Sequence, residues 1–178
     1  MATTAIPTEP TNPFLTYNFL VKWDNVYVAA VTRVGGLTKK TEVVSFRAGG
    51  QPQTPVKIPG VTDYQPVVLE RGITTDVAFE QWANKVWYYP NTATLGQEVS
   101  LQDFRKNIQI ELYNQAGQVV VRYNLYNCWP SEYTALPELS SEANTVALAS
   151  LTLEHEGWDR DTTVTPPTLP SFTLPASS

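Results

Sequence analysis

Apolar and polar residues alternate along most of this chain, and a period of two predicts β-strands. In the first run, FLTYNFLVKW, the side chains of Tyr17, Phe19, Val21 and Trp23 share one face. Asp24 and Asn25 follow, a pair typical of a hairpin turn, and the run VYVAAVTR then returns. The tetrapeptide QAGQ joins two later runs into a second predicted hairpin. Further strands are predicted at TEVVSFRAG, YQPVVLERG, NIQIELYN, VVVRYNLYN and NTVALASLTLEHEGW.

One segment, TTDVAFEQWANKVWYY, departs from this alternation and has helical spacing. Thr75 is placed to cap the helix, and Asp76 would lie in the first turn, where the helix dipole favours a negative charge. We expect one amphipathic helix at about 75–88, about three turns long, with its aromatic stripe packed on a sheet. The predicted fold class is α+β, mainly β, with antiparallel sheets. The stripe consists of Phe79, Trp82, Ala83 and Val86.

Proline-rich ends divide the chain into three parts. Residues 1–13 predict a flexible N-terminal arm, residues 14–160 the folded domain, and residues 161–178 a Pro/Thr/Ser-rich C-terminal tail. The tail is either a disordered end or a segment that docks through Phe172 and Leu174. Inside the domain, Arg47 to Gly60 carries three glycines and three prolines, so we expect a long loop without regular structure that is either functional or mobile.

The charge pattern excludes one class of function. Charged residues make up 16% of the chain, below the ~25% of an average soluble domain, which indicates surface that contacts other protein. The net charge is -5, whereas a sequence-independent DNA binder needs a basic face. From Glu132 onward there are seven carboxylates against the single cation Arg160. This acidic end serves solubility or repels a polyanion that slides past it.

A single cysteine excludes an internal disulfide and fits a reducing compartment. The beginning MATTAIPTEPTNP has no basic and apolar regions of a secretory signal, so we expect synthesis in the cytoplasm. No apolar run approaches the ~20 residues that cross a bilayer.

The chain offers few residues for catalysis. His155 is the only histidine, and we expect it at the surface or in an interface. Cys128 has no base near it in sequence and is expected to be a small buried apolar residue. One histidine and one cysteine far apart cannot form a metal site. The carboxylates Glu70, Asp103 and Glu111 permit a hydrolase in principle, but nothing singles them out. We therefore expect no enzyme, no cofactor and no metal.

The order and spacing of several segments resemble a known family. The segments are YNFLVKWDN, VGGLTKKTEVVSFRAGG, VVLERGITTDVAFEQW, IQIELYNQAGQVVVRYNLYNCWPSEY and LTLEHEGW. Together they resemble the tail tube proteins of contractile-tailed bacteriophages and the inner tube proteins of contractile injection systems. The resemblance runs from about Phe14 to Trp158.

The resemblance implies a tail-tube-type β-barrel or sandwich with its helix on the outer side. Hexameric rings of such subunits stack into a hollow tube, which sheath contraction drives through a target envelope. The implied partners are other copies of the chain, a sheath protein, baseplate and tube-terminating proteins, and a luminal cargo protein or phage DNA. No stable small-molecule ligand and no direct membrane insertion are implied. Assembly would take place in the bacterial cytoplasm, in a phage tail or a contractile injection particle.

The family pattern also assigns roles to residues of this chain. The loop from Arg47 to Gly60 would be an arm between rings, and the Trp129-Pro130 pair would end a strand. Candidate contacts between subunits are Arg47, Gln51, Lys57, Ile58 and Arg71. Structural motif residues are Trp82, Trp129, Pro130, His155 and Gly157.

Two other functions stay open from the residues alone. The first is a non-catalytic β-sandwich module that binds carbohydrate or protein, and the second is the hydrolase with paired carboxylates. The assembly state separates the tube subunit from both, because only the tube subunit forms rings or filaments.

Overall fold

The computed structural model describes residues 18–28, 30–47, 49, 55–88, 99–139, 146–165 and 167–168. Within them the chain forms antiparallel strands and one short helix, which confirms the predicted fold class. The elements are β1 (Phe19–Trp23), β2 (Val26–Tyr27), β3 (Val31–Val34), β4 (Lys39–Phe46), β5 (Val56–Tyr64), β6 (Val67–Gly72), α1 (Ala78–Val86), β7 (Lys106–Tyr113), β8 (Val119–Thr134), β9 (Leu148–Glu154) and β10 (Gly157–Arg160).

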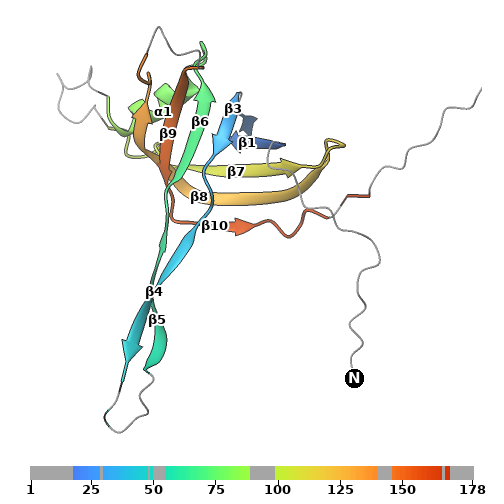
Figure 1. The fold of residues 1–178 in the computed structure, drawn as a ribbon. Helices are drawn as coiled ribbons and strands as arrows, with labels where there is room; N and C mark the ends of the chain where they lie inside the picture. Colours follow the sequence, from blue (N-terminus) through green and yellow to red (C-terminus); the bar gives the residue numbers. More distant parts are fainter. Residues whose placement is uncertain are drawn as a thin grey trace, which may run out of the picture.

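The long strand β8 organises the main sheet, whose strand order is β2-β1-β7-β8-β9-β6-β3. The first part of β8 pairs with β7 on one side and β10 on the other, and its last part pairs with β9. The sheet therefore has two halves joined by β8. Figure 1 shows β7, β8 and β10 running across the view and β9, β6 and β3 running nearly upright.

The two halves and the helix enclose one core. Trp23 of β1 packs against α1, with ring centroids 4.9 Å from Trp82 and 5.6 Å from Phe79. The Trp82 indole Nε1 donates a hydrogen bond to the Phe104 carbonyl at 2.6 Å. The aromatic stripe of the helix thus packs on the sheet, as predicted. The cluster contains Val21, Trp23, Val28, Val67, Leu69, Phe79, Trp82, Ile108, Ile110, Leu125, Cys128, Leu151 and Leu153.

Both predicted hairpins are confirmed. Asp24 and Asn25 have φ of 47° and 64°, and this pair of positive angles gives the turn that fits a twisted two-stranded hairpin. Gly117 has φ of 76° in the turn between β7 and β8. There the Asn114 side chain accepts the backbone N–H of Gln118 at 2.9 Å.

Two predicted strands are divided. VYVAAVTR gives β2 and β3, because Ala30 has φ of 60° and turns the chain from one half of the sheet to the other. The last predicted strand gives β9 and β10, which pair with different parts of β8. The break lies at His155, directly after β9.

The helix is shorter than predicted and is not capped by Thr75. It spans Ala78–Val86, and Val77 occupies the N-cap position without a side-chain cap. Asp76 lies just before the helix, where its Oδ1 accepts the N–H of Ala78 at 2.9 Å. That hydrogen bond satisfies a free donor at the helix start, which explains why the helix begins later.

The prediction that Trp129 and Pro130 end a strand is wrong. β8 continues through both residues to Thr134, and Pro130 is buried. A register shift follows Pro130, so its missing N–H falls at an irregular position of the ladder, where proline is tolerated. The pair lies where β8 changes partner, since Cys128 pairs with β7 and Trp129 with β9.

Candidate assembly surface

Strands β4 and β5 form a separate two-stranded sheet that projects from the main sheet (Figure 1). We call residues 39–64 the β4–β5 arm. Part of the segment predicted to lack regular structure is therefore strand, because β5 begins at Val56 and includes Pro59 and Gly60. Eight residue steps along β5 give the arm a length of about 26 Å. Proline and glycine are tolerated here because the ribbon is all edge and has a register shift beside Pro59.

One side of the arm is apolar. Val44 pairs with Ile58 and Phe46 pairs with Val56, so these four side chains share a face. They are 43%, 48%, 58% and 50% exposed in that order. We call this set the apolar face of the arm. Side chains of this kind are normally covered, so the apolar face is a surface that the single subunit leaves open.

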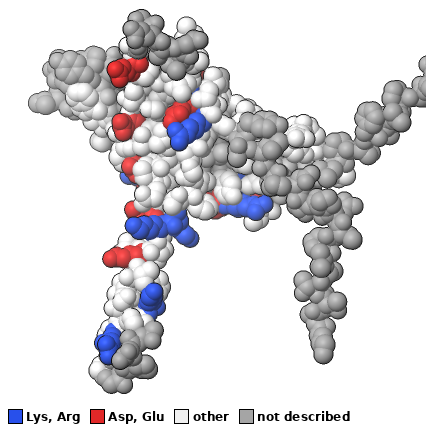
Figure 2. Space-filling view, viewed as in Figure 1, with Lys and Arg blue, Asp and Glu red and all other residues white. Residues whose placement is uncertain are grey.

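The β4–β5 arm also carries more positive charge than the rest of the chain. It holds four cations and two carboxylates, while the whole chain has a net charge of -5. Figure 2 shows Lys and Arg atoms along the projecting arm and several acidic groups on the body. The cations are Lys39, Lys40, Arg47 and Lys57.

The five candidate contact residues differ in how exposed the structure leaves them. Lys57 and Ile58 are exposed on β5, and Arg47 is exposed directly after β4. Gln51 lies outside the described residues. Arg71 is buried inside the subunit, with 4% of its surface exposed, and so it offers little to a neighbour.

Arg71 instead holds the start of the helix. Its guanidinium pairs with the Asp76 carboxylate at 2.8 Å and lies 4.1 Å from the centre of the Phe79 ring. The hydrogen bond from the Ala78 N–H and the Arg71 guanidinium lower the pKa of Asp76. The cation thus packs the β6–α1 connection, and sequence reasoning missed this intramolecular role because Asp76 was assigned to the helix dipole.

A buried polar network lies on the face of β7 and β8 away from the core. Glu111 is 1% exposed and accepts hydrogen bonds from Tyr113 at 2.7 Å, Arg122 at 2.8 Å and Tyr27 at 3.1 Å. Burial alone would raise the pKa of Glu111, but these three donors lower it below its usual value. Arg122 also pairs with Asp161 at 3.2 Å. The Glu111 carboxylate therefore links β2, β7 and β8, and through Arg122 it is connected to the segment after β10. Its role is structural.

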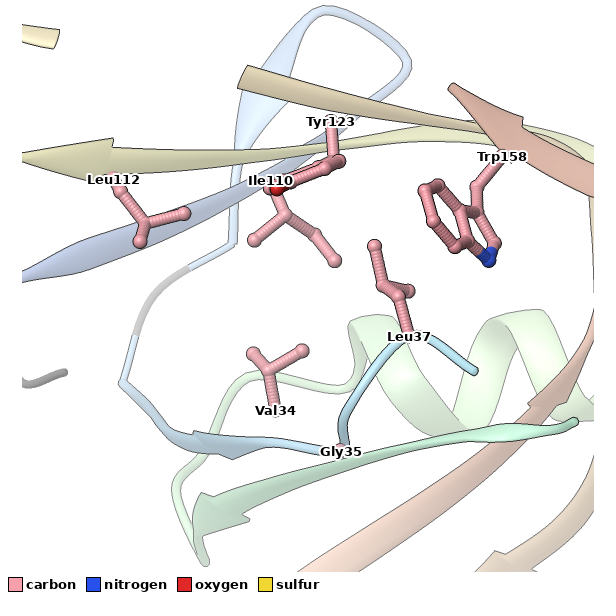
Figure 3. A pocket seen from close by; sticks show the side chains of 7 residues that line it. All are labelled: Val34, Gly35, Leu37, Ile110, Leu112, Tyr123 and Trp158. Atoms are coloured by element: carbon pink, nitrogen blue, oxygen red, sulfur yellow. The ribbon is translucent and has the colours of Figure 1, made fainter. Parts of the chain in front are cut away.

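An open cleft of about 280 Å³ lies between the two halves of the sheet (Figure 3). Its volume is below the ~300–1,000 Å³ of typical small-molecule sites, and its lining is mostly apolar. We assign no ligand to it. The lining residues are Val34, Gly35, Leu37, Ile110, Leu112, Tyr123 and Trp158.

The remaining motif residues have structural positions. Trp82 is in the core, and Gly157 begins β10. Cys128 is fully buried as predicted, and burial raises the pKa of its thiol to about 12. His155 is 9% exposed, so the expectation of a surface position is wrong. Its imidazole Nε2 contacts the Gln65 carbonyl at 3.1 Å, which ties the residue to the base of the β4–β5 arm.

Among the described residues, no group of three or more His, Cys, Asp and Glu side chains is placed to hold a metal ion. Nor does that part of the chain contain a helix long and apolar enough to cross a membrane.

Comparison with known proteins gives a consistent result. The model of the T4-like virus tail tube protein gp19 family matches residues 15–159. No curated protein sequence matches the chain significantly.

Several solved structures are similar over most of their length. A chain of the anti-feeding prophage cap, which terminates the tube of that particle, is 27% identical with a TM-score of 0.71, covering 91% of this chain and 99% of that one. A chain of the PVC sheath-tube complex, an extracellular contractile injection system in the extended state, is 23% identical with a TM-score of 0.67, covering 90% and 98%. Hcp1 from Flavobacterium johnsoniae is 10% identical with a TM-score of 0.52, covering 81% and 94%. The similarity to the PVC chain and to Hcp1 shows a shared fold.

Proposed function

The chain belongs to the T4-like virus tail tube protein gp19 family, and on this premise we propose that its copies form six-membered rings that stack into a hollow tube. It is a tail tube subunit of a phage tail or of a contractile injection system, a structural protein without catalysis. The observation that carries the proposal is the β4–β5 arm, whose apolar face the subunit itself leaves uncovered.

An isolated two-stranded ribbon is at best marginally stable in water, so the arm needs a surface to pack against. Its four exposed apolar side chains and its edge backbone groups supply the contacts that such packing uses. The positive charge of the arm favours an acidic partner. Another copy of this chain fits, because the chain outside the arm is acidic.

A projecting arm that packs on a different surface of the next copy makes a heterologous contact. Such contacts close into rings or continue as filaments, and a stacked tube uses both. We propose that the β4–β5 arm contacts the adjacent ring, with Arg47 and Lys57 near carboxylates of the neighbour. Gln51, which lies outside the described residues, is proposed to belong to the same contact. Six-fold symmetry was applied to the anti-feeding prophage baseplate, which contains a chain with the same fold, and this symmetry supports rings of six.

The proposed partners beyond the chain itself follow from family membership. They are a sheath protein around the tube, and baseplate and tube-terminating proteins at its ends. Chains with the same fold occur in a sheath-tube complex, a baseplate and a sheath/tube terminator. The lumen would conduct phage DNA or a cargo protein, and sheath contraction would drive the tube through a target envelope. Assembly would take place in the bacterial cytoplasm.

Negative-stain electron microscopy of the purified chain, together with its mass in solution, tests the proposal. Six-fold rings or hollow tubes are the expected result. A protein that is monomeric at high concentration is then mixed with preformed tubes or a purified baseplate, because nucleation can limit tube growth. Failure to add to these under conditions where the subunit is folded would overturn the proposal.

A further inference from the structure

The β4–β5 arm joins the body through two short links, which we call the root: residues 35–38 between β3 and β4, and residues 65–66 between β5 and β6. Two backbone hydrogen bonds cross the root, from the Gly35 N–H to the Val68 carbonyl at 2.7 Å and from the Gln65 N–H to the Thr38 carbonyl at 3.1 Å. Pro66 has no N–H to add another. Few backbone hydrogen bonds therefore join the arm to the body at the root, and the direction of the arm needs a further constraint.

The two links are held by different means. On the β3–β4 side, Leu37 packs against the hydrophobic core. On the β5–β6 side, Gln65 and Pro66 are exposed, and this link has no core residue of its own. Its fixed point is the His155 imidazole, which comes from the turn between β9 and β10.

His155 contacts both Gln65 and the residue at the end of β5. Its Nε2 lies 3.1 Å from the Gln65 carbonyl oxygen, and its ring centroid lies 5.7 Å from that of Tyr64. The same Tyr64 ring approaches Gly157, where an added Cβ would lie 3.6 Å away. Since the turn carrying His155 is fixed by the Glu156 N–H, which donates to the Tyr126 carbonyl at 3.1 Å, the imidazole is anchored to the body.

The hydrogen-bond direction is determined by the partner. A carbonyl oxygen only accepts, so Nε2 carries the proton and donates it to Gln65. The other nitrogen, Nδ1, is buried without a hydrogen-bond partner among the described residues. The ring therefore has one specific polar contact, which is directed at the root, and one aromatic contact, which is directed at the last residue of the arm.

We propose that His155 is the positioning residue of the β4–β5 arm, fixing the direction in which the arm leaves the body. The inference rests on the proposed function, in which the arm must reach another copy. Because the arm is about 26 Å long, a swing of about 10° at the root moves the tip by about 4.5 Å. Apolar side chains pack only within ~4.0–4.5 Å, so such a swing is enough to lose the contact of the apolar face with its neighbour.

Three variants separate the two contacts of the imidazole. His155→Phe keeps an aromatic ring beside Tyr64 and removes the donor. His155→Gln keeps a donor and removes the ring. His155→Ala removes both, and the two milder variants keep the test valid if the alanine variant does not fold.

The measurement is the distance between spin labels on the arm and the body in the unassembled full-length subunit. Labels are attached at Ser45→Cys on the arm and Gln115→Cys in the β7–β8 turn, both exposed positions. Cys128 is fully buried and does not compete for the label. Urea unfolding of each variant serves as the control for the core.

The parent protein is expected to give one narrow distance distribution. His155→Phe and His155→Ala should broaden it by about 3.5 Å or more, the displacement that a swing of about 10° gives at Ser45, which lies about 20 Å along β4 from Lys39. Hydrogen exchange of the Gln65 backbone N–H, which donates to the Thr38 carbonyl, should rise about fivefold, the factor by which the loss of the His155 hydrogen bond to the Gln65 carbonyl favours opening of the root. His155→Gln keeps a donor, so its distance distribution and its Gln65 exchange rate should stay close to those of the parent protein. A purely structural role of the ring would not predict this result.

A distribution that stays as narrow in folded His155→Phe and His155→Ala as in the parent protein overturns the proposal. Failure of the proposed function can be told apart from failure of this inference. A parent protein that does not assemble can still show the narrow distance distribution and the broadening in the variants. In a protein that assembles, the same variants should raise the concentration needed for tube formation, whereas changes on the apolar face leave the label distance unchanged.

Discussion

The substitution Phe46→Ser is the most direct test of the apolar face of the β4–β5 arm. Phe46 is 58% exposed in the subunit, and an aromatic side chain buries ~150–250 Å² when it is fully covered. Covering the exposed part therefore removes on the order of 100 Å² from water, or about 2.5 kcal/mol at ~25 cal/mol per Å². If each added subunit places one arm on a neighbour, the critical concentration for assembly should rise roughly 70-fold in the variant.

The assay is pelleting of tubes over a concentration series, with electron microscopy of the pellet. Urea unfolding of the unassembled subunit should change by no more than ~0.5 kcal/mol, because Phe46 lies outside the core. Leu101→Ser is the matched control, since Leu101 is 86% exposed on the body between α1 and β7. An unchanged critical concentration for Phe46→Ser, with a folded subunit, would refute the assignment of the apolar face to a contact between copies.

Three further predictions concern the subunit itself. Trp82→Ala should lower the free energy of unfolding by ~3–5 kcal/mol in urea titrations, since it empties a core position and removes the hydrogen bond to Phe104; a loss below about 1 kcal/mol would contradict the core assignment. Cys128, whose pKa is raised to about 12 by burial, should react with a thiol reagent at about pH 8 only after unfolding, and prompt reaction in the native state would contradict its burial. Glu111 has a lowered pKa, so its stabilising contribution is present above the pKa of the unfolded chain and is lost as the pH falls through the folded value. Glu111→Gln should therefore be less stable near neutral pH and lose less stability on acidification, as read from melting temperatures between about pH 7 and about pH 3; parallel curves would contradict the network.

Most of the fold was predictable because it follows from local patterns. The alternation of apolar residues located the strands of the body, and the Asp24-Asn25 pair and Gly117 located both hairpin turns. The helical spacing of Phe79 and Trp82 identified the helix and the side that it buries. These signals depend on residues within a few positions of one another, which is the range over which periodicity is informative.

The errors arose where distant parts of the chain decide the outcome. Pro130 lies inside a strand because β8 exchanges one neighbour for another there, which is a property of the whole sheet. His155 is buried because the base of the β4–β5 arm, 90 residues away in sequence, packs against it. Arg71 is a different case, because it is enclosed by Asp76 and Phe79, which follow it closely in sequence. None of these contacts has a periodic signature in one sequence.

Strand β4 of the β4–β5 arm was predicted, but the start of β5 was mispredicted for a different reason, which bears on assembly. Sequence rules consider only the contacts that a segment can make within its own chain. Because proline and glycine weaken a strand inside a sheet, Pro59 and Gly60 argue against a strand by those rules. The structure nevertheless pairs β4 with β5 and leaves Phe46 and its neighbours in water. A two-stranded ribbon is at best marginally stable alone, so contacts with another molecule would stabilise the arm. The segment that resembles a loop in one chain therefore contributes Val56 and Ile58 to the surface through which we propose that the tube is built.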